Sequence, residues 1–208
     1  MLEPAISFDL LHPIPHLYVI SGPSGAGKDA VLNELRKRDL PFHYLVTTTS
    51  RLPRPGEREG IDYNFISREE FKKRIARDEF VEYALVYEDY KGIPRAQIEQ
   101  ALASGKDVFM RIDVQGARTI RSKFRNTVLI FLVPENEEEW LDRFRKRKAD
   151  SPEQLKIRIE TARKELEYLP EFDYIVVNRH DQLEDAADTI LAIHQAETHA
   201  IHKQRLAQ

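Results

Sequence analysis

The sequence predicts an α/β fold in which a parallel sheet is flanked by helices. Apolar runs typical of buried strands recur along the chain, at residues 17–20, 107–112, 128–133 and 174–177. Segments in which apolar residues follow helical spacing lie between these runs. A glycine-rich loop joins the first strand to the first helix. Strands that alternate with helices in this way pair in parallel, and the helices then cover both faces of the sheet.

Length and composition indicate one globular domain. A chain of 208 residues with 41% hydrophobic and 32% charged residues can bury a core, and it does not have the composition of a disordered or membrane protein. The formal net charge of −3 argues against general nucleic-acid binding. The absence of cysteine excludes disulfides, thiol catalysis and cysteine-type zinc sites. No targeting segment or membrane span is evident in the sequence, so we expect a cytoplasmic location.

The glycine-rich loop has the pattern of a phosphate-binding loop. It follows the strand at 17–20 and leads into a helix whose apolar face carries Val31, Leu32 and Leu35. Such a loop turns successive backbone N–H groups toward one anion, and the helix N-terminus adds partial positive charge. An ordinary glycine-rich turn is the alternative. The pattern predicts that a nucleoside triphosphate is held by Gly22, Pro23, Ser24, Gly25, Ala26, Gly27, Lys28 and Asp29.

The middle of the chain has shorter predicted strands at a different spacing, which indicates an inserted lobe. Strands are expected at residues 42–47, 63–66 and 79–86, with a helix that begins at the capping box of residues 67–70 and another at 97–103. Toward the C-terminus, helices are expected at 137–148, from Pro152 through an apolar stripe that ends at Leu166, and from 183 to about 193.

A proline-stiffened pair of arginines suggests a second phosphate site. Arg51 and Arg54 lie three residues apart, with Pro53 and Pro55 beside them, and Tyr63 follows at the start of a strand. Two fixed guanidinium groups suit a phosphate monoester, to which the tyrosine hydroxyl can add a hydrogen bond. The alternatives are a solvated basic loop and a packed tyrosine.

A basic helix and a group of histidines need separate interpretations. Arg143 and Arg147 share one helix face, which suits a lid over a transferring phosphoryl group, whereas an exposed charged helix is the alternative. His194, His199 and His202 have no second group of metal-ligating residues nearby in the sequence, so solvated histidines are expected there rather than a metal site.

Five blocks together resemble guanylate kinases. They run in the order and spacing of that family from about residue 17 to 192, and they read GPSGAGK (22–28), RLPRPGE (51–57), GIDYNF (60–65), IDVQGA (112–117) and YIVVN (174–178). The resemblance implies a P-loop kinase fold with an inserted GMP-binding lobe and a helical lid. It also implies transfer of the γ-phosphoryl group of ATP to GMP with Mg²⁺, giving ADP and GDP.

For the ATP side, the resemblance implies that Lys28 and the loop amides hold the phosphates and that Asn178 lies near the adenine. Arg143, Arg147 and Arg158 are the implied lid arginines. Phosphoryl transfer depends mainly on positioning and charge neutralisation, and one arginine can contribute roughly 10³–10⁵ in rate.

For the GMP side, the resemblance implies that Arg51, Arg54 and Tyr63 hold the phosphate, while Glu82 and Thr47 recognise guanine. Guanine offers N1–H and a 2-amino group as donors, and a carboxylate accepts both. Adenine leaves such a carboxylate unpaired, which permits discrimination of order 10⁴.

Three positions depart from the family pattern. Asp29 stands where Ser or Thr usually supplies a hydroxyl to Mg²⁺, and Arg111 stands where the family has an aspartate, which leaves Asp113 as the remaining carboxylate. Lys91 lies in the segment that usually contributes a second tyrosine to the GMP phosphate, and it can substitute as a cation. The pattern resembles plastid/mitochondrial-type and some bacterial guanylate kinases. We hypothesise that Asp29 and Asp113 are the metal-ligating residues, and that Lys91 and Asp113 contribute to the GMP site.

The expected organisation is a kinase domain over residues 16–195, between an extension at 1–15 and a tail at 196–208. Its core comprises 16–46, 95–136 and 160–195, its GMP-binding lobe 47–94 and its lid 137–159. The expected partners are GMP and ATP, without nucleic acid or membrane, in a monomer or homodimer. Two alternatives are a ribose 1,5-bisphosphate phosphokinase and a non-catalytic guanylate-kinase-like module that binds phosphopeptides. The intact Lys28 and the arginine block at 51–57 favour the kinase of GMP.

Overall fold

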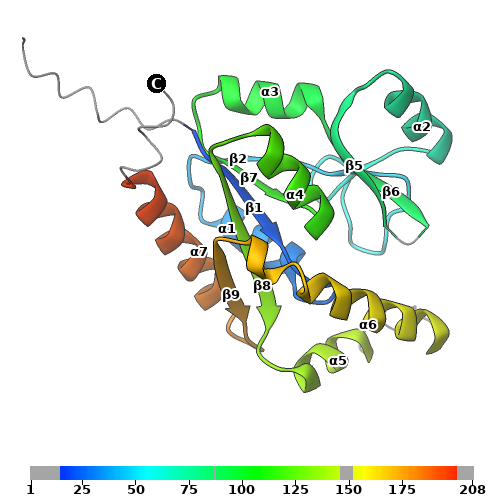
Figure 1. The fold of residues 1–208 in the computed structure, drawn as a ribbon, viewed down its shortest axis with the longest axis vertical. Helices are drawn as coiled ribbons and strands as arrows, with labels where there is room; N and C mark the ends of the chain where they lie inside the picture. Colours follow the sequence, from blue (N-terminus) through cyan, green and yellow to red (C-terminus); the bar gives the residue numbers. More distant parts are fainter. Residues whose placement is uncertain (1–14, 87, 146–151, 201–208) are drawn as a thin grey trace, which may run out of the picture.

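The computed structural model describes residues 15–86, 88–145 and 152–200 and confirms the predicted α/β fold (Figure 1). Within these residues a five-stranded sheet has the order β2-β7-β1-β8-β9, and every pair of neighbours is parallel. Its strands are β1 (Leu17–Ser21), β2 (His43–Tyr44), β7 (Val108–Arg111), β8 (Thr127–Pro134) and β9 (Tyr174–Asn178).

Helices cover both faces of this sheet because its central strands are apolar on both sides. On β1, Tyr18 and Ile20 are buried against one face, and Leu17 and Val19 against the other. The first face packs against α1 (Lys28–Lys37) and α7 (Leu183–Thr198), and the second against α3 (Arg95–Ala103) and α4 (Val114–Lys123). Figure 1 shows α7 and α4 on opposite sides of the strands.

The helix α4 is absent from the sequence-based expectations. Asp113 caps its N-terminus, and Val114, Ala117 and Ile120 form its buried face. Gly116 in its first turn is a poor helix former and weakens the local signal. Packing against β5 and β8 stabilises the helix nevertheless.

A second sheet lies beside the first, at the right of Figure 1. Its strand order is β4-β3-β6-β5, and its strands are β3 (Thr48–Thr49), β4 (Asn64–Phe65), β5 (Phe80–Val86) and β6 (Asp89–Pro94). The helix α2 (Arg68–Ala76) lies between β4 and β5 in the chain. The ring of Phe71 on α2 stacks on Phe80 and Tyr90, with centroids 4.3 and 5.2 Å away. The strand expected at 42–47 is shorter, because the chain leaves the first sheet after Tyr44 and joins the second at Thr48.

Two helices lie at the lower right of Figure 1, next to the glycine-rich loop. They are α5 (Glu137–Arg145) and α6 (Pro152–Leu166), and a 3₁₀ turn (Leu169–Glu171) follows them. Trp140 packs with Ala162 and donates from Nε1 to the carbonyl oxygen of Ser24 at 2.8 Å. Arg147 lies outside the described residues, as does the side chain of Arg158.

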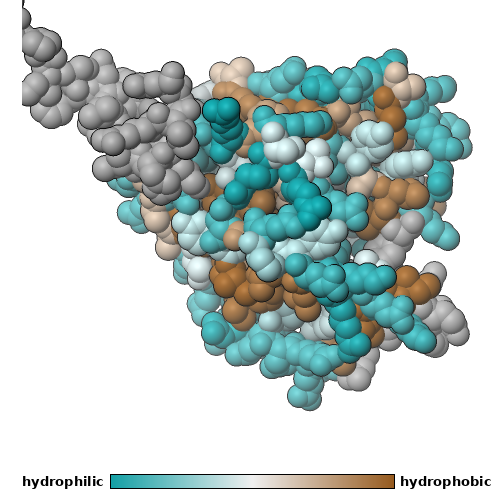
Figure 2. All heavy atoms as spheres, in the orientation of Figure 1, coloured by the Kyte–Doolittle hydropathy of each residue, from teal (hydrophilic) through white to brown (hydrophobic). Residues whose placement is uncertain are grey.

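The surface in Figure 2 is mainly hydrophilic, with hydrophobic areas over β8, β9 and the C-terminal end of α6. Leu166 and Ile175 are among the exposed apolar side chains. In the described part of the chain, no helix combines the length and apolar character that crossing a membrane requires.

The prediction that His194 is solvated is wrong, because its ring contacts Asp107. The helix α7 extends past the predicted end near residue 193 and so brings His194 to the amino end of the sheet. Nε2 of this histidine lies 2.7 Å from a carboxylate oxygen of Asp107, whose other oxygen accepts from the backbone N–H of His16, also at 2.7 Å. Burial alone would raise the pKa of the Asp107 carboxyl, but hydrogen bonds from His16 and His194 hold it well below its usual range. Asp107 therefore ties α7 to the start of β1 and β7.

We predict that Asp107→Asn lowers the free energy of unfolding by about 1.5–3 kcal/mol at pH 7, because it weakens hydrogen bonds to a charged acceptor. A carboxyl whose pKa falls on folding stabilises the fold above about pH 4 and loses that contribution as the pH falls further. The difference from wild type should therefore shrink at low pH, as measured by urea unfolding. Asp188→Asn, which removes an exposed pair with Arg38, is the control and should cost less than about 1 kcal/mol. Equal losses in the two variants would contradict this role of Asp107.

Candidate active site

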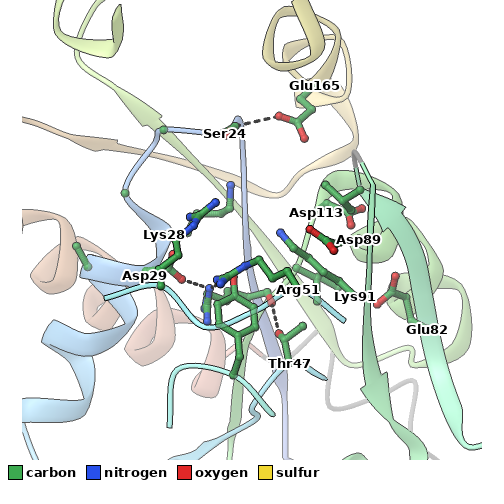
Figure 3. Close-up of a pocket in the computed structure, with 18 residues that line it drawn as sticks. Ser24, Lys28, Asp29, Thr47, Arg51, Glu82, Asp89, Lys91, Asp113 and Glu165 are labelled. Atoms are coloured by element: carbon green, nitrogen blue, oxygen red, sulfur yellow. Dashed lines mark hydrogen bonds and ion pairs between the residues drawn. The ribbon is translucent and has the colours of Figure 1, made fainter. Parts of the chain in front are cut away.

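The candidate site is a cavity at the carboxyl ends of β1 and β7. Ile20 pairs with Arg111 in the sheet register, so the loop after β1 and the segment after β7 emerge side by side. The cavity has a volume of about 300 Å³ (Figure 3). It is lined by Ser24, Gly25, Gly27, Lys28, Asp29, Ala30, Thr47, Arg51, Arg54, Tyr63, Glu82, Val86, Asp89, Lys91, Arg111, Ile112, Asp113 and Glu165.

The glycine-rich loop is held from behind by β9 and α5. Asn178 donates from Nδ2 to the carbonyl oxygen of Ala26 at 2.8 Å, and Arg143 donates to the same oxygen from Nη1 at 3.0 Å. Gly27 caps α1 with φ +91°, and a Cβ there would lie 2.3 Å from Nδ2 of Asn178. The predicted residues Asn178 and Arg143 are therefore not on the cavity wall. They lie behind the loop and fix the shape of the loop.

Lys28 lines the cavity with its side chain folded back against the loop. Its ammonium donates to the carbonyl oxygens of Gly22 and Pro23 at 2.5 and 3.1 Å. Burial lowers the pKa of Lys28 to about 8, although the carboxylate of Glu165 favours its charged form. An incoming anion would stabilise the ammonium further, as a phosphate-binding lysine requires.

Glu165 is a cavity residue that the sequence analysis missed. Its Oε2 accepts from the backbone N–H of Ser24 at 3.0 Å, and it reaches the loop from the last turn of α6 (Figure 3). Burial raises the pKa of this carboxyl. One loop amide of the kind that binds phosphate is therefore bonded to a carboxylate. Spacing alone offered no signal, because Glu165 is one of several charged residues near the end of this helix.

The two arginines of the proline-rich tract line the same cavity as the loop. Arg51 makes a bidentate pair with Glu57 at 2.6 and 2.5 Å, and the same carboxylate accepts from the backbone N–H of Arg54 at 2.8 Å. The guanidinium of Arg51 also stacks over the ring of Tyr63, 4.6 Å from its centroid. The fold thus brings together Arg51, Arg54 and Tyr63, which the sequence predicts as a phosphate site. The pairing of Glu57 with Arg51 was not predicted.

Glu82 is buried at the far end of the cavity. Burial, reinforced by the nearby charge of Asp113, raises the pKa of its carboxyl to about 8. Gly116 makes room for it, since a Cβ on that glycine would lie 2.8 Å from the carboxyl carbon. Thr47 also lines the cavity and donates from its hydroxyl to the carbonyl oxygen of Arg111 at 3.1 Å.

The acidic groups predicted to ligate a metal already have protein partners. Asp29 forms an ion pair with Arg111, and one oxygen of Asp113 accepts from the backbone N–H groups of Gln115 and Gly116, both at 2.9 Å. Within the described ranges, no three or more His, Cys, Asp or Glu side chains are grouped so that they could hold a metal ion. A site with only one or two protein carboxylates suits Mg²⁺, because this ion usually keeps several water ligands and is bound largely through substrate phosphates.

Comparisons with known proteins agree on one family. The family model for guanylate kinase matches residues 15–197. A relative from Oryza sativa subsp. japonica, guanylate kinase 2, chloroplastic/mitochondrial, is 46% identical over 192 residues, which cover 92% of this chain and 67% of the relative. A guanylate kinase from Clostridium perfringens is 44% identical over 181 residues, covering 87% and 83% of the two chains. The crystal structure of guanylate kinase from Anaplasma phagocytophilum superposes with a TM-score of 0.76 at 31% identity, covering 91% of this chain and 89% of that one.

We predict that Gly27→Ala lowers the affinity of the loop for inorganic triphosphate at least tenfold. The added methyl group would displace the amide of Asn178 and open the loop. Gly105→Ala is a matched control, because Gly105 also has positive φ (+69°) but no atom within 4 Å of the added Cβ. Both variants should lose about 1–2 kcal/mol of stability from the left-handed backbone, and only the first should lose binding in calorimetry. Equal triphosphate affinities in the two variants would contradict this account of the loop.

Proposed function

The chain belongs to the guanylate kinase family, and on that premise we propose how its residues transfer the γ-phosphoryl group of ATP to GMP. It is a nucleoside monophosphate kinase that produces ADP and GDP. One observation supports the residue roles: the glycine-rich loop with Lys28 and the Arg51, Arg54 and Tyr63 cluster line the same cavity. Two phosphate sites that share one cavity can bring a donor and an acceptor phosphate together.

We propose that the loop amides and Lys28 bind the phosphates of ATP. Anion binding at the loop would displace Glu165 from the amide of Ser24 and draw Lys28 away from the loop carbonyl oxygens. Asn178 and Arg143 keep the loop in shape through the carbonyl oxygen of Ala26. Their expected contacts with adenine and with the transferring phosphoryl group remain predictions, as do the roles of Arg147 and Arg158.

On the acceptor side, we propose that Arg51, Arg54, Tyr63 and Lys91 bind the phosphate of GMP. Arg51 is already held in place by Glu57, so its guanidinium is oriented before the ligand arrives. Burial lowers the pKa of Lys91, and a phosphate dianion nearby would restore its preference for the charged form. These cations would neutralise charge that spreads over the phosphoryl oxygens during transfer.

We propose that Glu82 and Thr47 recognise guanine. The carboxylate of Glu82 can accept from N1–H and the 2-amino group together, and its burial makes an unsatisfied acceptor costly. AMP would present a lone pair to that carboxylate and would therefore be rejected.

Mg²⁺ is part of the proposal, because the described residues suit an ion that arrives with ATP. Bound there, it would supply positive charge that offsets the negative charge of the phosphates. Asp113, which lines the cavity, is the proposed protein carboxylate for its hydration shell. A metal contact by Asp29 remains a prediction, since the structure gives that carboxylate a second role in its pair with Arg111.

The proposed organisation assigns GMP binding to residues 47–94 and a lid to residues 137–159. We further propose a cytoplasmic monomer or homodimer that binds neither nucleic acid nor membranes, and fractionation of the source cells tests the location against an organelle. Closure of the lid over both nucleotides would exclude water and so suppress hydrolysis of ATP.

The direct test of the function is ADP release from ATP and Mg²⁺ with GMP, AMP, CMP, UMP or ribose 1,5-bisphosphate offered separately. We expect turnover with GMP and a value of kcat/KM at least 10³-fold lower with AMP. Turnover with ribose 1,5-bisphosphate instead, or binding of a phosphopeptide without any turnover, would favour the corresponding alternative function.

The raised pKa of Glu82 predicts that GMP binding depends on pH. Reading the two guanine donors requires the carboxylate, which forms in the free protein only as the pH rises through about 8. The affinity for GMP without ATP should therefore increase between pH 6.5 and 8.5, and binding at pH 7 should release a proton. Calorimetry in two buffers of different ionisation enthalpy measures both effects. Glu82→Gln should lose this pH dependence, and a variant that keeps the wild-type profile would show that another group titrates.

A further inference from the structure

We propose that Arg111, held by Asp29, is a positioning residue that orients the hydroxyl of Tyr63 toward the phosphate of GMP. The inference rests on the proposed function, because it concerns the same acceptor site. It assigns roles to two of the three residues at which the sequence departs from the family pattern, Arg111 and Asp29.

The guanidinium of Arg111 contacts two other parts of the chain, the segment Asp62–Tyr63 and Asp29. It extends from the end of β7, where it is buried, and Nη1 donates to the hydroxyl oxygen of Tyr63 at 2.6 Å. Nη2 donates to the carbonyl oxygen of Asp62, and the guanidinium carbon lies 4.2 Å from the centroid of the Tyr63 ring. An ion pair with Asp29 connects it to the first turn of α1. One side chain thereby joins the sheet, the helix that follows the glycine-rich loop, and the GMP-binding lobe.

The hydrogen-bond chemistry of arginine fixes the direction of the tyrosine proton. A guanidinium has only donors, so the oxygen of Tyr63 must accept from Arg111. The phenolic proton therefore cannot be directed at Arg111 and stays available for an acceptor in the cavity that both residues line. Phosphate oxygens are strong acceptors. Arg111 thus sets Tyr63 as a donor to GMP before the nucleotide binds, which reduces the ordering that binding requires.

Asp29 stabilises the charged guanidinium of Arg111, because a buried charge needs a compensating opposite charge. Burial lowers the pKa of Arg111 to about 10, so the group stays charged at neutral pH. Asp29 is half-exposed and directly follows Lys28, the lysine proposed to bind ATP phosphates. The pair therefore fixes the position of the acceptor site relative to the donor site.

The test is a double-mutant cycle on GMP affinity, measured by calorimetry without ATP or Mg²⁺. We expect Arg111→Met to raise the Kd for GMP at least tenfold, in line with the loss of an oriented hydrogen bond to a charged group. Tyr63→Phe should have a similar effect. Adding Arg111→Met to Tyr63→Phe should change the Kd by less than about threefold, because Arg111 acts through the hydroxyl that the second variant lacks.

Steady-state kinetics separate positioning from general damage to the fold. Arg111→Met should raise the KM for GMP while the KM for ATP changes by less than about threefold, and Arg111→Lys should recover part of the loss because an ammonium still donates. Arg118→Met on α4 removes an exposed pair with Glu171 of the 3₁₀ turn and is the matched control, with wild-type GMP affinity expected. If Arg111→Met does not fold, Arg111→Lys takes its place in the cycle with a smaller expected effect.

Asp29→Asn tests the other half of the pair. The proposal predicts a Kd for GMP at least about threefold higher without any metal, since the guanidinium loses its anchor. An unchanged Kd together with a shifted Mg²⁺ titration would assign Asp29 to the metal and overturn its role here. Equal effects of Arg111→Met in the wild-type and Tyr63→Phe backgrounds would overturn the role of Arg111. A wild-type protein that does not bind GMP would contradict the proposed function itself, and that outcome is distinct from the other two.

Discussion

The parallel pairing of β1 with β7 on one side and β8 on the other is the constraint on which the site depends. Ile20 pairs with Arg111 in one neighbour and with Ile130 in the other, so the three strands end at the same edge. The glycine-rich loop, the segment that carries Asp113, and α5 after β8 therefore gather at one edge of the sheet. The apolar residues that fix this register also fix where the polar groups meet, as is general for ligand sites of open α/β sheets.

Electrostatics organise the cavity before any nucleotide is bound. Burial disfavours the charged forms of Lys28 and Glu82. It lowers the pKa of the lysine and raises the pKa of the glutamate, in each case to about 8. Each would regain full charge in contact with the ligand group proposed for it, phosphate for the lysine and the guanine donors for the glutamate. In the free protein, Glu165 occupies the amide of Ser24 that a phosphate would take, whereas Glu57 keeps Arg51 oriented toward its ligand. Binding then exchanges one set of ionic contacts for another, which favours specificity over raw affinity.

The sequence predicted those parts of the site that depend on local pattern. The loop at 22–28 was identifiable because glycine spacing, strand and helix are contiguous, and the arginine tract at 51–57 because prolines restrict it. The roles proposed for Glu82 and Thr47 came only from the resemblance, since an isolated glutamate or threonine has no sequence signature of its own. Glu165, α4 and the pair of Asp29 with Arg111 depend on tertiary contacts between distant segments. Asp29 and Arg111 were noticed only as departures from a pattern, and their partnership emerged when β7 and α1 were placed side by side.

The chemistry proposed for this cavity is tested most directly by the products formed from ATP, Mg²⁺ and GMP. Both nucleotide products should be quantified over time by chromatography, with and without GMP. A cavity that holds donor and acceptor phosphates together and excludes water predicts ADP and GDP in equal amounts, with very little ADP when GMP is omitted. ADP formed at the same rate without GMP, or GMP bound without any GDP, would contradict the proposal that the two phosphate sites face each other for transfer.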